Sequence, residues 1–164
     1  MNKLKDIDEL SIIVEKEREN GKKIVFANGC FDILHVGHIR YLKEAKELGD
    51  LLIVAINSDS SARKLKGNGR PLTPENERAE IIAAIECVDY VIIFNESNVS
   101  SLLLTLKPDI HAKGTDYTED SVPEADTVKA YGGRVTITGD KKERSSTEII
   151  KKVKAEAKVK GTLI

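Results

Sequence analysis

Short apolar runs alternate along this chain with segments in which apolar residues recur at helical spacing. The run Leu51–Asn57 is almost continuously apolar, as expected for a strand that helices cover on both faces. Further strands are predicted at Lys23–Asn28, Tyr90–Phe94, Asp109–Ala112 and Arg134–Ile137. This alternation predicts an α/β fold: a Rossmann-like, doubly wound parallel sheet of about five strands in an α/β/α sandwich.

The helical segments lie between and around these strands. They are predicted at Asp8–Asn20, from about His35 to Leu48, near Val99–Leu106, near Pro123–Tyr131 and from Ser146 onward. Another helix should begin at Thr73-Pro74-Glu75, with Thr73 as its N-cap and Pro74 in the first helical position. Because 164 residues show no linker or repeat, we expect one domain over 1–164, with a leading helix within 1–21 and a tail at 158–164.

The charge composition excludes several classes of partner. The chain has 27 acidic and 26 basic residues, so its net charge of −1 gives no general attraction to nucleic acid or to a membrane surface. Its polar N-terminus and the absence of a long apolar stretch favour a cytoplasmic protein with neither a secretory signal nor a membrane span. Cys30 and Cys87 are too few for a disulfide framework, and we expect both to be reduced.

Two of the three histidines, His35 and His38, flank Val36-Gly37 where the first predicted strand gives way to a helix. Three residues apart on a first helical turn, their imidazoles lie on one side of the helix. Gly37 leaves the backbone open to a ligand, and the free N–H groups and dipole at a helix N-terminus favour an anion. The pattern predicts a phosphate-binding site.

Polar segments follow the predicted strands, at the edge where ligands of open α/β sheets bind. They are Gly29–His38, Asn57–Asp59, Lys113–Tyr117 and Lys141–Thr147. The hydroxyl residues Ser145, Ser146 and Thr147 are either ordinary caps of the last helix or a second helix N-terminus that faces the same phosphates. The candidate cations are those in glycine-rich or strand-end segments, namely Lys66, Arg70, Lys113 and Arg144.

Other nucleotide and hydrolase motifs are missing from the sequence. It contains neither the G-x-x-x-x-G-K-[ST] loop of P-loop proteins nor a G-x-G-x-x-G after its first strand, and it has no G-x-S-x-G elbow. A zinc site of His35, His38 and Asp32 lacks a clear further ligand, so no resident metal is expected.

With these motifs the chain resembles the cytidylyltransferase-like nucleotidyltransferases, which share H-x-G-H near the first strand and a Ser/Thr-rich start of the last helix. Within them it is most similar to the adenylyltransferase part of the bacterial heptose-phosphate kinase/adenylyltransferases. The segments that carry this likeness are Asn28–His38, Asn57–Asp59, Lys66–Pro71, Val88–Val91, Lys107–Asp109, Lys113–Tyr117, Gly132-Gly133 and Ser146–Ile150. The kinase portion is absent here, so the resemblance implies a stand-alone transferase.

The resemblance implies transfer of AMP from ATP to a sugar 1-phosphate, D-glycero-D-manno-heptose 1-phosphate, giving ADP-heptose and pyrophosphate. It assigns catalysis to His35, His38 and Lys113, and acceptor binding to Asp32, Asn57 and Asp59, with Asp32 alternatively bound to the Mg²⁺ that the nucleotide brings. It assigns nucleotide binding to Asn28, Gly29, Cys30, Phe31, Gly37, Lys66, Arg70, Gly114, Asp116, Ser145, Ser146 and Thr147. It also implies a homodimer that works on small-molecule substrates.

Two alternatives keep the fold and change the function. The phosphate-binding residues do not distinguish ATP from CTP, so a CTP-dependent cytidylyltransferase acting on glycerol 3-phosphate or another alcohol phosphate is one. The other is a regulatory module that binds nucleotide without turnover, against which the two histidines, Lys113 and the hydroxyl pair argue.

Overall fold

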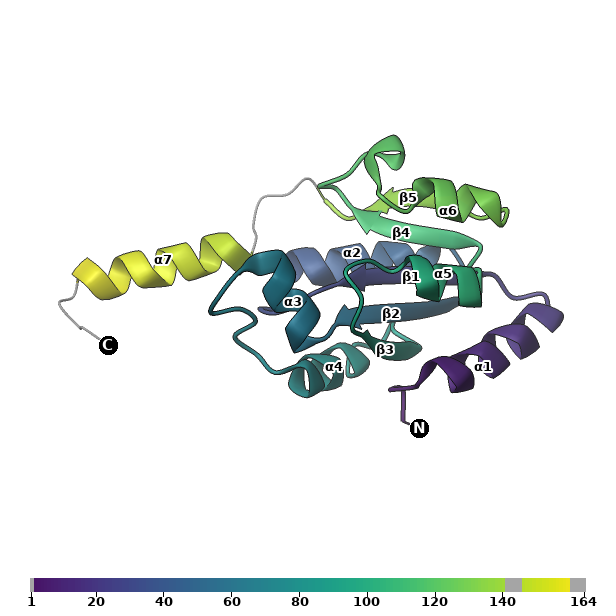
Figure 1. Cartoon of the computed structure of the whole chain (residues 1–164), viewed down its shortest axis with the longest axis horizontal. Coiled ribbons are helices and arrows are strands. Elements are labelled where there is room, and N and C mark those ends of the chain that lie inside the picture. Colours follow the sequence, from purple (N-terminus) through teal and green to yellow (C-terminus); the bar gives the residue numbers. More distant parts are fainter. Residues whose placement is uncertain (1, 141–145, 160–164) are drawn as a thin grey trace.

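All five strands belong to one parallel sheet in the order β3-β2-β1-β4-β5. We describe a computed structural model of the chain over residues 2–140 and 146–159. The strands are β1 (Ile24–Gly29), β2 (Leu51–Asn57), β3 (Tyr90–Phe94), β4 (Ile110–Gly114) and β5 (Arg134–Thr138). Figure 1 shows the sheet between its helices, which confirms the predicted Rossmann-like α/β/α fold.

Two separate apolar clusters, one on each face, hold the helices to the sheet. One face packs against α1 (Ile7–Glu19), α5 (Ser100–Leu106) and α6 (Ala125–Ala130). The other packs against α2 (Val36–Glu47) and α4 (Glu75–Ala83). Successive residues of β1 alternate between the clusters, as strand geometry requires, because Ile24 and Phe26 join the first and Val25 and Ala27 the second.

The remaining elements lie at or beyond the sheet edges. The short α3 (Asp59–Lys66) follows β2, a 3-10 turn at Glu119–Ser121 precedes α6, and α7 (Ser146–Val159) ends the described chain. In Figure 1, α7 extends from the edge where the strands end, opposite to α1. It continues through Lys158 and Val159, two residues into the segment predicted as a tail, and 160–164 lie outside the described residues.

The strand order reverses direction at β1, because β2 and β3 lie on one side of it and β4 and β5 on the other. In open α/β sheets such a switch point leaves a crevice beyond the carboxyl ends of the two central strands. Here those ends are Gly29 of β1 and Gly114 of β4, each followed by a polar segment singled out in the sequence.

One predicted helix start is wrong. Pro74 is the N-cap of α4, and the Thr73 hydroxyl donates to the main-chain oxygen of Asp32 (2.9 Å) instead of capping the helix. A tertiary partner 41 residues away has displaced the local capping bond. Within the described ranges, no helix is both long and apolar enough to span a bilayer.

Candidate active site

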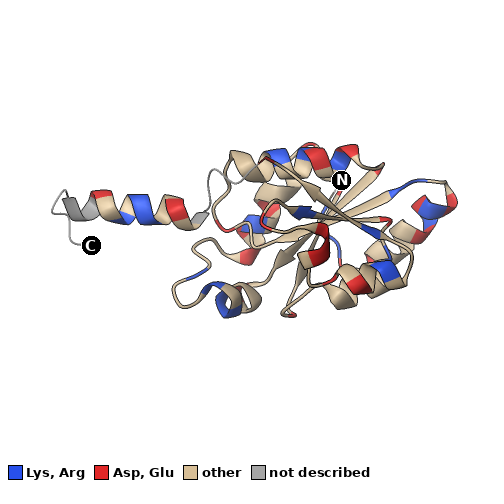
Figure 2. Ribbon diagram, turned by 90° about the horizontal axis from the view of Figure 1, so that it is seen from above, with Lys and Arg blue, Asp and Glu red and all other residues tan. Residues whose placement is uncertain are grey.

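A cavity of about 680 Å³ opens at the carboxyl ends of β1 and β4, within the size range of ligand pockets. Most of the predicted site residues line it: Asn28, Gly29, Cys30, Phe31, Asp32, His35, Gly37, His38, Asn57, Lys66, Arg70, Lys113, Gly114, Asp116 and Thr147. Asp59 is not among its lining residues. The lining carries both basic side chains (Arg40, Lys66, Arg70 and Lys113) and acidic ones (Asp32, Asp116 and Asp140), and charges of both signs are also interspersed over the rest of the ribbon (Figure 2).

The two histidines are held by the backbone at the start of α2. The Gly37 amide donates to His35 Nδ1 (3.2 Å), and the His35 amide donates to His38 Nδ1 (3.3 Å). An Nδ1 that accepts a hydrogen bond cannot carry a proton, so both rings hold theirs on Nε2 and present Nε2–H as a donor. The ring centroids are 3.9 Å apart, and both residues line the cavity.

The backbone at Gly37 packs closely against the ring of His35. A Cβ at this position would lie 3.0 Å from the Cε1 and Nδ1 atoms of His35, closer than side chains normally pack. The bare backbone therefore makes room for the His35 ring. Phe31, at a left-handed φ of 49°, packs edge-on against the His38 ring with centroids 5.2 Å apart.

The second helix N-terminus predicted to face the phosphates reaches the same cavity. Thr147, in the first turn of α7, lines it together with Gly37 of α2. Ser145 lies outside the described residues, as does the side chain of Ser146. A single pocket thus joins the paired imidazoles to a hydroxyl at the start of α7.

Asp32 is almost fully buried and holds the loop that precedes α4. Its carboxylate accepts hydrogen bonds from Arg70 Nε (2.5 Å), the Leu72 amide (2.7 Å) and the Thr73 amide (3.0 Å). Burial alone would raise the pKa of this carboxyl, but these donors outweigh it and keep the pKa below its usual value. Both oxygens are engaged by the protein, so this geometry favours a loop anchor over a direct ligand of the acceptor.

Replacing Asp32 with asparagine should lower the free energy of unfolding by about 2 kcal/mol, because charge-assisted hydrogen bonds at a buried site are lost. A carboxyl with a lowered folded pKa stabilises above its unfolded pKa and loses that effect as pH falls. The difference from wild type in urea titrations should therefore be constant above about pH 5 and shrink below about pH 4. Asp120→Asn, at a side chain 97% exposed, is the control. A pH-independent difference would contradict this account.

Arg78, which sequence reasoning missed, organises the neighbouring strand ends. Its side chain is fully buried and donates to the main-chain oxygens of Cys30 (2.5 Å) and Thr73 (2.9 Å) and to the Asp59 carboxylate (2.8 Å). The predicted acceptor ligand Asp59 is thus committed to Arg78. Asn57 does line the cavity, where its Oδ1 lies 3.5 Å from the Cys30 sulfur.

Lys113 points from the end of β4 into a buried polar cluster. Its ammonium donates to Asn28 Oδ1 (3.0 Å), lies 3.4 Å from Glu124 Oε2 and sits 5.2 Å from the centre of the Tyr117 ring. Burial lowers the pKa of Lys113, while Glu124 opposes that shift. His111, two residues earlier on the same face of β4, shares Asn28 Oδ1 (3.1 Å), and burial lowers its pKa to about 3.

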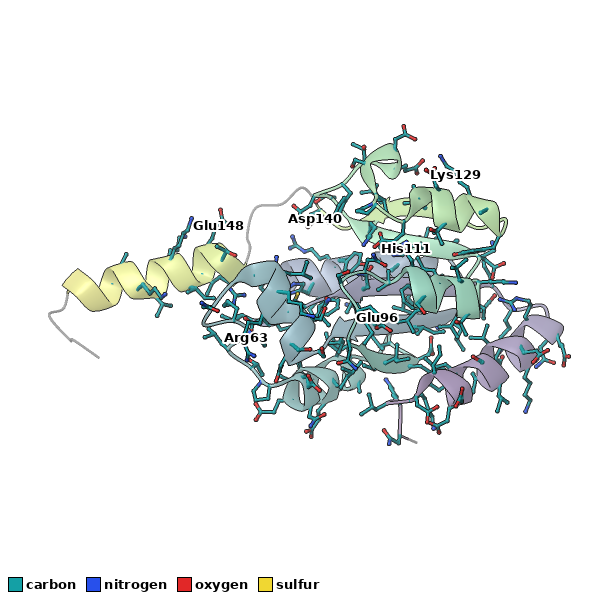
Figure 3. All side chains as sticks on the ribbon, viewed as in Figure 1. Arg63, Glu96, His111, Lys129, Asp140 and Glu148 are labelled. Atoms are coloured by element: carbon teal, nitrogen blue, oxygen red, sulfur yellow. The ribbon has the colours of Figure 1, made fainter. Side chains whose placement is uncertain are left out.

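Arg40 and Tyr117 also line the cavity, although the sequence analysis assigned a role to neither and included Tyr117 only as the last residue of the polar segment Lys113–Tyr117. Arg40, on α2 five residues after His35, forms an ion pair with Asp140, which lies two residues after the end of β5. Figure 3 labels Asp140. Exposed arginines on helices are common, so only the position of Arg40 two residues after the H-x-G-H motif could have indicated it.

Two carboxylates that were predicted at the acceptor site, those of Asp32 and Asp59, are held by protein donors and not arranged as a metal site. Asp32 is engaged by three protein donors and Asp59 by Arg78. In the part of the chain that is described, no group of three or more His, Cys, Asp or Glu residues could hold a metal ion.

This site, at the switch point of a doubly wound sheet with H-x-G-H on its first crossover helix, fits the family that sequence comparison identifies. The family described as Cytidylyltransferase-like matches residues 26–164, and the chain belongs to it.

Comparison with individual proteins shows which members of this family the chain is similar to. The Bifunctional protein HldE of Geobacter metallireducens is 52% identical over 151 residues, which are 92% of this chain and 31% of that protein. Its counterpart in Pelobacter propionicus is 50% identical over 152 residues, with 93% and 31% covered. The chain thus spans about a third of the length of these relatives. A crystal structure of the lipopolysaccharide core biosynthesis protein from Thermoplasma volcanium GSS1 has 40% identity and a TM-score of 0.61, covering 71% of this chain and 94% of that one.

Proposed function

We propose that this chain is a nucleotidyltransferase that transfers AMP from ATP to D-glycero-D-manno-heptose 1-phosphate and releases pyrophosphate. The observation that carries the proposal is the shared cavity, in which the His35–His38 pair, Lys113 and Thr147 surround one space. The likeness to bifunctional HldE proteins and to a lipopolysaccharide core biosynthesis protein supports the sugar-nucleotide branch of the family.

The reaction needs positioning and charge stabilisation more than acid–base chemistry. An oxygen of the sugar phosphate attacks the α-phosphorus of ATP, and the bond from that phosphorus to the pyrophosphate oxygen breaks. The attacking group is already an anion, so no base is required. The barrier comes from bringing two anions together and from the charge that develops on the leaving pyrophosphate.

The donors of the cavity match these demands. The Nε2–H groups of His35 and His38 would stabilise charge at the α-phosphate and the leaving oxygen, and the Thr147 hydroxyl at the start of α7 would hold the β- and γ-phosphates. Lys113 would bridge the attacking and attacked phosphates. Lys66, at the end of α3, and Arg70, which Asp32 holds, would close over the nucleotide phosphates.

The nucleotide is proposed to bind as its Mg²⁺ complex, with the ion carried by the phosphates as part of the substrate, because the Asp32 and Asp59 carboxylates are already paired within the protein. We place the reaction in the cytoplasm, where ATP and phosphorylated sugars occur, and do not expect nucleic acid as a partner.

We treat 1–164 as one nucleotidyltransferase domain, since one sheet contains every strand of the described residues. The homodimer stays a prediction that sedimentation would test.

A substrate matrix tests the proposal directly. Pyrophosphate release should be measured with ATP or CTP, each combined with heptose 1-phosphate or glycerol 3-phosphate. We expect turnover with ATP and the heptose phosphate. Turnover only with CTP and the alcohol phosphate would replace this function with the alternative, and nucleotide binding without pyrophosphate from any pair would favour a regulatory module.

Cysteine labelling tests nucleotide binding without turnover. Cys30 lines the cavity, whereas Cys87 packs against the core at the turn between α4 and β3, and burial raises the pKa of both thiols. MgATP at ten times its Kd should slow alkylation of Cys30 by iodoacetamide about tenfold, because only about one molecule in eleven is then unliganded. Mass spectrometry should show the Cys87 rate unchanged. Equal Cys30 rates with and without saturating MgATP would place the nucleotide elsewhere.

A further inference from the structure

Glu124 lies behind Lys113 and outside the cavity. It is the N-cap residue of α6, is only 4% exposed and is not among the cavity-lining residues. Its Oε2 atom is fully buried with no other hydrogen-bond donor in the described chain, and the Lys113 ammonium lies 3.4 Å away. A buried carboxylate with this single contact is costly unless the ammonium stays charged.

The contacts of Asn28 with Lys113 and His111 determine which way its side-chain amide is turned. An ammonium can only donate, so the Asn28 atom that faces Lys113 must be the amide oxygen. His111 Nε2 shares that oxygen and must therefore also donate, so this nitrogen carries a proton, and burial, which lowers the pKa of His111 to about 3, keeps the ring neutral. The NH₂ group of Asn28 is then turned away from both, and Asn28 can donate to a ligand in the cavity that it lines.

The charge of Lys113 depends on one partner. The titratable groups that face it are Glu124 from α6, neutral His111 from its own strand and the Tyr117 ring from the following loop, while β1 contributes only the uncharged Asn28. Burial favours the neutral amine and lowers the pKa of Lys113, and Glu124 is the group that raises it. Figure 3 labels His111 in the interior of the domain, at the strand that carries Lys113.

We propose that Glu124 is a positioning residue for Lys113: its carboxylate keeps the ammonium charged and fixed between Asn28 and the cavity, so that Lys113 can meet two phosphates at once. The inference rests on the proposed function in one respect, the assignment of Lys113 to those phosphates. The pairing itself is a property of the protein without substrate.

The pairing is tested by NMR on the whole chain with ¹³C-labelled lysine. The Lys113 ¹³Cε signal is assigned as the one lost in Lys113→Arg and is then titrated with pH. Glu124→Gln keeps the shape of the side chain and removes its charge, so the pKa of Lys113 should fall by about 1 to 3 units. Glu80→Gln, at an exposed position on α4, should leave it unchanged. Equal Lys113 midpoints in wild type and Glu124→Gln would overturn the proposal.

If the Glu124→Gln variant does not fold, the Glu124–Lys113 pairing can be tested on the wild-type protein. The Glu124 ¹³Cδ resonance should show an inflection at the pH at which Lys113 loses its proton, because the two groups are in contact. A Glu124 signal without that inflection would overturn the pairing. This readout, like the lysine titration, needs no substrate.

The pH dependence of kcat/KM then shows whether the Glu124–Lys113 pairing contributes to turnover. In Glu124→Gln the alkaline limb of kcat/KM should move to lower pH by the same shift as the Lys113 pKa, and kcat/KM on that limb should fall about tenfold per unit. Glu124→Asp, which keeps the charge, should restore part of the shift. An alkaline limb that does not move would overturn the positioning role. A shifted lysine titration in a protein that forms no pyrophosphate would leave the pairing intact and refute the proposed function instead.

Discussion

Replacing His38 with alanine should lower kcat about 10²- to 10³-fold, the cost of removing one donor aimed at developing charge. Binding of ATP should change little, because Thr147, Lys113 and the α2 backbone still surround the phosphates. The readout is steady-state pyrophosphate release at neutral pH with both substrates saturating, combined with the Cys30 protection assay to confirm that nucleotide still binds.

Two variants make this test specific. Val36→Ala changes a half-exposed side chain on the same helical turn and should keep kcat within about threefold. The double variant His35→Ala/His38→Ala should cost less than the product of the single effects, because the two rings are in contact, with centroids 3.9 Å apart, and act together. Wild-type kcat in His38→Ala would remove this histidine from the mechanism.

Replacing Arg78 with methionine should lower the free energy of unfolding by about 3 kcal/mol, the range found when one partner of a buried pair is removed. The side chain is fully buried, and its loss leaves the Cys30 and Thr73 carbonyl oxygens and the Asp59 carboxylate without their donor. Urea unfolding followed by circular dichroism gives the value, and a similar m-value in both proteins shows that the comparison is sound.

The control for this substitution is Arg63→Met. Arg63 is exposed on α3 (Figure 3), so its replacement should change stability by no more than about 0.5 kcal/mol. Arg78→Lys keeps the charge without the planar set of donors and should recover only part of the loss. An Arg78→Met protein within about 1 kcal/mol of wild type would show that Asp59 and the two carbonyl groups find other partners.

The strand pattern and the site motif could be predicted from sequence because both are local. Leu51–Asn57 and Tyr90–Phe94 are strands over the residues predicted, since a buried parallel strand is recognisable as a continuous apolar run. The start of α2 follows from His35-Val36-Gly37-His38, in which the capping bonds join residues within one turn. Lys113 was identifiable because a lysine at the end of an apolar strand is not on a solvated helix face.

The residues that were missed acquire their roles from distant segments. Arg78 stands among Glu75, Glu77 and Glu80 and looks like one more charge on an exposed helix, yet two of its three partners, Cys30 and Asp59, lie 48 and 19 residues earlier and are brought to it only by the fold. Glu124 follows a proline at a helix start, where an acidic residue is ordinary capping chemistry. Asp32 was expected at the acceptor, but its partners lie 38 to 41 residues later in the chain.

The pairing of β1 with β4 has a consequence for how the reactive groups are kept in place. Phe26 pairs with His111 and Ala27 with Ala112, and this alignment brings the next two side chains, Asn28 and Lys113, together on the α6 side. Were β4 to slide by a single position, Lys113 would turn toward the layer formed by α2 and α4, and its ammonium would leave both Glu124 and the phosphate crevice. The distance between Asn28 and Lys113 is therefore set by the backbone hydrogen bonds between β1 and β4, which do not depend on the identity of the side chains.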